Sequence, residues 1–138
     1  MTKKDIIALV NEIGSCISKE ERSLLFVKEG TSGNNKKIGC NQFRDIASLC
    51  KSAECYEEIE MLIRYNMAKC KNGESWMFNC GNKKLFGEIV LGNMSKINNA
   101  ENKNDTEVLK SLELYFGYLY WQSRIWTAES EATNEKKG

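Results

Sequence analysis

The sequence has 138 residues, 41% hydrophobic and 28% charged, with a net charge of +1 at pH 7. A chain of this length fits one domain and can bury a core without metal or disulfide cross-links. It contains no histidine, which excludes catalytic triads of the Ser-His-Asp and Cys-His types. Because 20 basic residues are balanced by 19 acidic ones, binding to nucleic acid would have to depend on local clusters of positive charge.

Targeting and membrane segments are not predicted. The apolar run over residues 6–10 is too short for the hydrophobic part of a secretory signal peptide. No stretch approaches the roughly 20 apolar residues that cross a bilayer. We therefore expect a cytoplasmic protein that does not associate with a membrane.

The six cysteines include no Cys-x-x-Cys pair, and there is no histidine to complete a zinc site. Reduced thiols that act as small core residues are therefore favoured over a metal site. Cys16, Cys50 and Cys70 fall on predicted apolar faces. We expect no metal and no cofactor.

The first predicted element is an amphipathic helix, because apolar residues recur at helical spacing from Ile6 to Ile17. Ser18 and Glu21 form a capping-box pattern, which predicts that the chain breaks there and starts a new helix. The expected buried residues of this second segment are Leu24, Leu25 and Val27.

A basic, glycine-rich loop is predicted over residues 29–39. Helical spacing resumes over residues 41–50 and again over residues 56–70. These two stretches predict two further helices with a break between them.

The next predicted helix spans residues 85–97, despite Gly87 and Gly92. Glycine is unfavourable inside a helix, so both positions indicate close approach of a neighbouring backbone. Asp105 or Thr106 is the expected N-cap of the last helix.

These elements predict an all-α fold, a compact single-domain bundle of five to six short helices. No alternating strand pattern stands out. The expected domain covers residues 1–128, and residues 129–138 are predicted to form a disordered polar tail.

The last helix carries more apolar surface than one core needs. One broad face, from Val108 to Trp126, is an ordinary core stripe. A second stripe at 4-3-4 spacing is buried between layers or faces a partner. Because Tyr and Trp anchor interfaces, we favour a protein–protein interface. Its residues are Leu114, Tyr118, Trp121 and Ile125.

Basic and polar residues gather in two places along the chain. Arg44 and Lys51 are seven residues apart and share one helix face. Polar residues at the start of that helix suit a phosphate group. A solvated charged face is the alternative interpretation. The candidate RNA-binding residues are Lys36, Lys37, Asn41, Gln42, Arg44, Lys51, Arg64, Lys69 and Lys71.

Three stretches carry a resemblance to a known family. They are residues 40–46 (CNQFRDI), 58–69 (EIEMLIRYNMAK) and 112–121 (LELYFGYLYW). In this order they resemble the helix-opening motif, the next helix and the aromatic-rich closing helix of the small helical subunit of type III-A CRISPR effector assemblies, the Csm complexes.

The resemblance implies a non-catalytic subunit of a ribonucleoprotein that acts in antiviral defence. Its implied partners are other subunits of the complex, stacked copies of itself, and the backbone of the guide RNA and target RNA. Nuclease and cyclase chemistry belongs to other subunits, so we expect no enzymatic activity and no catalytic residues. Arg44 is the first candidate for RNA contact by its position in the motif. The alternative function is a helical protein–protein interaction adaptor that does not contact RNA.

Overall fold

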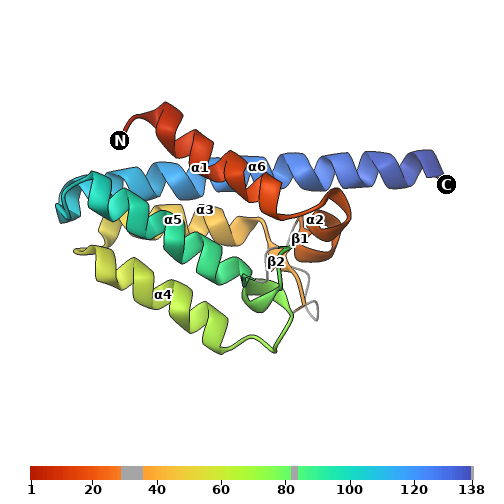
Figure 1. The fold of residues 1–138 in the computed structure, drawn as a ribbon, viewed down its shortest axis with the longest axis horizontal. Coiled ribbons are helices and arrows are strands. Elements are labelled where there is room, and N and C mark those ends of the chain that lie inside the picture. Colours follow the sequence, from red (N-terminus) through yellow and green to blue (C-terminus); the bar gives the residue numbers. More distant parts are fainter. Residues whose placement is uncertain (29–35, 82–83, 138) are drawn as a thin grey trace.

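The computed structural model describes residues 1–28, 36–81 and 84–137, with residues 133–137 described by their backbone only. Six α-helices in these ranges form one compact bundle, which confirms the predicted all-α fold (Figure 1). The helices are α1 (Lys3–Cys16), α2 (Lys19–Leu25), α3 (Asn41–Ser52), α4 (Tyr56–Ala68), α5 (Phe86–Ala100) and α6 (Asp105–Lys137). A 3₁₀-helix, η1 (Ser75–Met77), lies in the connection between α4 and α5.

Helix α6 is the central element of the bundle and contacts every other α-helix. It has 33 residues and is about 50 Å long, so the expectation of short helices is wrong for this element. Its C-terminal part projects beyond the other helices (Figure 1). Residues 129–137 contain no glycine or proline, so no helix-breaking residue stops the helix near residue 128. The boundary between a folded domain and a tail at that residue stays a prediction.

The capping box between α1 and α2 is present as predicted. The Glu21 amide donates to Ser18 Oγ at 3.1 Å, and the Ser18 amide donates to Glu21 Oε1 at 3.0 Å. The expected burial is confirmed for Leu25, which is fully buried. It is wrong for Leu24, which is 58% exposed, and Val27 is only half-buried. Neighbouring residues of a helix point about 100° apart, and α2 turns only one narrow side to the core.

Two very short parallel strands were not predicted. β1 (Phe26–Val27) pairs with β2 (Ile38–Gly39), with Phe26 opposite Ile38. Two residues are too few to show the alternation by which strands are recognised in a sequence. The pair brings two buried side chains into the core and fixes the chain just before α3. Most of the predicted loop, residues 29–35, lies outside the described residues.

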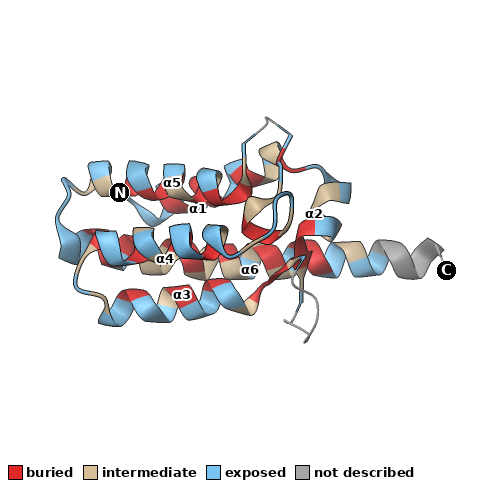
Figure 2. Cartoon of the chain, turned by 90° about the horizontal axis from the view of Figure 1, so that it is seen from below, coloured by how far each residue is buried: buried red, intermediate tan, exposed pale blue. Residues whose placement is uncertain are grey.

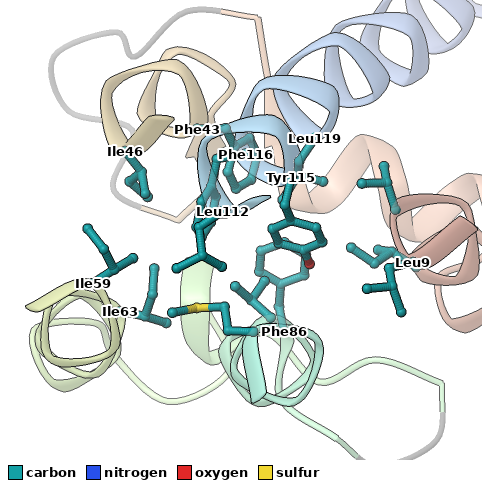
Figure 3. Packing of buried hydrophobic residues seen from close by; sticks show 14 of the residues in the cluster. Leu9, Phe43, Ile46, Ile59, Ile63, Phe86, Leu112, Tyr115, Phe116 and Leu119 are labelled. Carbon is teal, nitrogen blue, oxygen red and sulfur yellow. The ribbon is translucent and has the colours of Figure 1, made fainter. Parts of the chain in front are cut away.

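The core lies where all six α-helices turn their apolar sides inward, whereas their outer surfaces are exposed (Figure 2). Figure 3 shows Phe43 from α3, Ile63 from α4 and Phe86 from α5 around the inward side chains of α6. Tyr115 of α6 is fully buried, and its hydroxyl accepts a hydrogen bond from Asn93 Nδ2 at 3.0 Å. A buried polar pair of this kind is tolerated because both groups are satisfied.

The six cysteines are free thiols. Cys40, Cys50 and Cys80 are buried, whereas the other three are half-buried. Cys50 does lie on the buried face of α3, as its position in the apolar stripe predicted.

The predicted approach of a neighbouring backbone is found at neither glycine of α5, although a side chain approaches one of them. A Cβ atom on Gly87 would overlap the side chain of Met67 from α4, so the approaching group is a side chain. Gly92 has no atom within 4 Å of such a Cβ, because it faces solvent, and the expectation is wrong there. The N-cap of α6 is Asn104, whose Oδ1 accepts from the Glu107 amide at 3.1 Å, rather than Asp105 or Thr106.

Candidate nucleic-acid interface

Two basic segments that are distant in sequence meet at one end of the bundle. The Ser75 amide of η1 donates to the Lys36 carbonyl oxygen at 2.9 Å, which fixes the segment before β2 against the turn that follows α4. Lys69 is the C-cap residue of α4, and the Lys71 carbonyl accepts from Glu74 in the same turn. We call this group the lysine end; its members are Lys36, Lys37, Lys69 and Lys71.

Three members of the lysine end are exposed, and Lys37 is half-buried. The backbone bonds bring four lysines to this end, with Glu74 as an acidic residue of the same turn, so the local charge differs from the nearly neutral charge of the whole protein. This end can therefore attract a phosphate backbone.

The start of α3 lies beside the lysine end. Gln42 is exposed, but its Oε1 accepts a hydrogen bond from the indole Nε1 of the buried Trp76 at 3.1 Å. That amide oxygen therefore holds η1 against α3. Asn41 is half-buried at the first position of the helix. The N-cap residue Cys40 makes no side-chain capping bond, so the first amides of α3 are not occupied by a side-chain cap from the described residues.

Arg44 and Lys51 share the flank of α3 that faces α6, as their spacing predicted. The Arg44 guanidinium lies over the Tyr120 ring, 5.7 Å from its centroid. Lys51 Nζ is 3.6 Å from Glu113 Oε1. The side chains of Arg44 and Lys51 remain 57% and 67% exposed, so neither is enclosed in a buried salt link.

Arg64 lies apart from these residues, on the middle of α4. Its Nε is 3.9 Å from Glu60 Oε1, one helical turn away, and its side chain is 64% exposed. The loose geometry and the exposure leave this cation accessible to other anions.

Tyr65, which no sequence pattern singled out, lies among the basic residues near the end of α4. The ring is 60% exposed, and Lys69 Nζ lies 5.0 Å from its centroid. Its position four residues after Met61, on the side opposite the buried Ile63, is the signal that could have identified it.

A cavity of about 350 Å³ lies between the end of α3 and the start of α6. It is lined by charged residues of both signs and by Cys50, and no sequence pattern joins these two segments. Burial, reinforced by the charge of Glu113, raises the pKa of the Cys50 thiol to about 12. The thiol is therefore neutral at pH 7, which makes it a poor nucleophile. The lining residues are Cys50, Lys51, Ala53, Glu54, Thr106, Leu109, Lys110 and Glu113.

The second apolar stripe of α6 lies on its solvent-facing side. Leu114 and Tyr118 are half-buried at the edge of the core, whereas Trp121 is 63% exposed and Ile125 is 50% exposed. The rings of Tyr118 and Trp121 are 5.7 Å apart and form one continuous aromatic surface. Burial between layers is therefore wrong for Trp121 and Ile125, whereas Leu114 and Tyr118 pack against the core.

The described residues contain neither a metal-binding cluster nor a membrane-spanning helix. They hold no group of three or more Cys, Asp or Glu residues arranged to bind a metal ion. Within the same ranges, none of the helices combines the length and the apolar content that crossing a bilayer requires.

No family model matches the sequence, and no match was found among curated proteins or among solved structures. The residues themselves, together with the three stretches described above, therefore carry the functional inference.

Proposed function

We propose that the protein is a non-catalytic small subunit of a type III CRISPR RNA-guided interference complex in the cytoplasm. In this role it contacts the backbone of the guide RNA and its paired target RNA without reading their sequence. The resemblance in three stretches supports the proposal. The observation that carries it furthest is the Ser75–Lys36 backbone bond, which gathers lysines from two segments at one end of the bundle.

Contacts to phosphate need cations that are accessible and weakly held. Arg44 meets this condition, because it is 57% exposed and its Nε is 3.9 Å from the nearest paired carboxylate, that of Asp45. Exposed ion pairs of this length contribute little and are screened by salt. A phosphate group can therefore displace them at small cost. A subunit that accepts any target sequence needs only such phosphate and sugar contacts.

Contacts to other subunits form the second part of the proposal. The exposed stripe of α6 around Trp121 supplies aromatic surface of the kind that anchors protein interfaces. Neighbouring subunits and stacked copies of the protein are the proposed partners. Because the copies act together, each can bind RNA weakly while the assembly holds it tightly.

The test compares RNA retention by the assembled complex at increasing salt concentrations. Arg44→Ala and a Lys36→Ala/Lys37→Ala double variant should weaken retention and reduce the slope of log affinity against log salt by about one for each lost phosphate contact. Lys96→Ala on α5 is the matched control, because it removes an exposed lysine that belongs neither to the lysine end nor to the flank of α3 that carries Arg44. Circular dichroism should show unchanged helicity in all three variants.

The proposed RNA contact is wrong if retention and salt slope stay unchanged in both basic variants. The exposed Trp121 then favours the second candidate, a helical adaptor that binds only proteins. In that case Trp121→Ala releases the chain from its partner, and no RNA of fixed length co-purifies with the wild-type chain from its native host.

A further inference from the structure

Helix α4 presents an exposed ridge formed by Met61, Tyr65 and Lys69, which are spaced four residues apart and share one face. Met61 is 72% exposed and Tyr65 is 60% exposed. The buried side of the same helix carries Ile59 and Ile63, which are 2% and 0% exposed. The Tyr65 ring is therefore not needed to fill the core, and its face is open to a ligand.

Two basic residues adjoin the ring, and one of them, Arg64, is loosely paired with Glu60. Lys69 Nζ lies over Tyr65, 5.0 Å from the ring centroid, and Arg64 is the preceding residue of the helix. Lys71 follows in the turn that also holds Lys36. The ridge thus runs into the lysine end, whereas the acidic residues Glu57 and Glu58 lie in the first turn of the helix.

We propose that Tyr65 is a stacking platform for an unpaired base of single-stranded RNA, with Lys69 and Arg64 on the phosphates that flank this base. This inference rests on the proposed function and adds the form of RNA that this part of the surface binds. Exposed aromatic rings beside cations bind single strands without sequence preference, because every base has a π face. A cation–π contact at an exposed site is weak, so the Lys69 ammonium moves to a phosphate when a base covers the ring.

A nucleobase is favoured over an apolar protein segment because cations border the ring. A docking site for an apolar helix would extend the ridge with further apolar residues. Instead, the ridge ends in Lys69, and Arg64 adjoins it. A polyanion with flat aromatic groups complements both features at once.

The test measures fluorescence anisotropy of a labelled single-stranded uridine oligomer with the full chain, in parallel with an abasic oligomer of the same length. Tyr65→Ala should weaken binding of the uridine oligomer about 5- to 150-fold and leave binding of the abasic oligomer unchanged. Tyr65→Phe should retain wild-type affinity, because the ring remains. Lys69→Gln should instead reduce the salt slope for both oligomers. Leu24→Ala, which removes a similarly exposed apolar side chain on α2, is the matched control and should change neither.

Stacking is wrong if Tyr65→Ala binds the uridine oligomer as the wild type does, or if it loses affinity for both oligomers equally. If Arg44→Ala still lowers the salt slope of RNA retention, only the stacking inference is wrong and the proposed function stands. If the wild-type chain and the assembled complex show no salt-dependent affinity for RNA, both the stacking inference and the proposed function are wrong. Release of a partner protein by Tyr65→Ala, with RNA affinity unchanged, would assign the ridge to a protein interface instead.

Discussion

The amide of Tyr56 donates a hydrogen bond to Asp105 Oδ1 at 3.1 Å, which joins the first turn of α4 to the first turn of α6. The N-cap residue of α4, Cys55, makes no side-chain capping bond of its own. Asp105 therefore satisfies an amide at the start of a helix that is distant in sequence. The Tyr56–Asp105 bond holds the start of α4 against α6. It thereby also helps to hold α3, with Arg44 and Lys51, beside α6.

Replacing Asp105 with alanine should lower the free energy of unfolding by about 1 kcal/mol, the usual value for loss of a helix cap. Asp105→Asn keeps an oxygen acceptor and should lose less. Thr106→Ala changes the adjacent exposed residue and is the control. The measurement is urea unfolding followed by circular dichroism. Equal stability of Asp105→Ala and Thr106→Ala would show that this hydrogen bond does not stabilise the fold.

The two glycines of α5 should respond to alanine with opposite signs. Gly87→Ala should lower stability by about 1–2 kcal/mol, because its Cβ overlaps Met67 and the overpacking exceeds the gain in helix propensity. Gly92→Ala should raise stability by up to about 1 kcal/mol, because the new Cβ meets no atom within 4 Å. Thermal and urea unfolding of both variants test this. A gain in stability for Gly87→Ala would contradict the packing observed at Met67.

Alkaline pH should destabilise the protein through its buried thiols. Burial raises the pKa of Cys50 and of Cys80 to about 12, whereas a thiol in the unfolded chain titrates near pH 8.5. Above about pH 8.5 the unfolded state loses these protons and the folded state keeps them. The free energy of unfolding is therefore unaffected by the ionisation of these thiols below about pH 8.5. It decreases as pH rises towards 12, by at most about 1.4 kcal/mol per pH unit for each thiol.

The measurement for this prediction is the free energy of unfolding at pH 8 and at pH 10 under reducing conditions. A Cys50→Ala/Cys80→Ala double variant should show a smaller fall between the two pH values. A fall as large as that of the wild type would rule out these thiols as its cause.

Alanine variants of the two tryptophans of α6 should distinguish a loss of stability from a loss of binding to partner subunits. Trp126 is 5% exposed and stacks on Phe26 with ring centroids 5.6 Å apart, so Trp126→Ala should cost about 3–5 kcal/mol of stability. Trp121 is 63% exposed, so Trp121→Ala should change stability by no more than about 0.5 kcal/mol. Co-purification of the folded Trp121→Ala variant with its partners should nevertheless fail. Normal co-purification would remove the α6 stripe from the proposed interface.

Local sequence patterns were sufficient to predict the helices and several of their ends. The capping box of Ser18 and Glu21 and the shared face of Arg44 and Lys51 involve residues within two turns of one another. Such features depend on backbone geometry that repeats every 3.6 residues, so spacing alone predicts them. The two apolar stripes of α6 were also visible, although the pattern did not tell which of them faces solvent.

Features that depend on contacts between segments distant in the sequence were determined only by the tertiary structure. Sequence pattern predicted neither the Lys36–Ser75 bond that assembles the lysine end nor the cap that Asp105 provides for Tyr56. The exposure of Tyr65 and Trp121 likewise depends on which sides of α4 and α6 the other helices cover. The sequence determined by itself which residues share a face, because the helical repeat is local. Only the packed bundle determined which faces remain open, because burial depends on how helices far apart in the chain pair with one another.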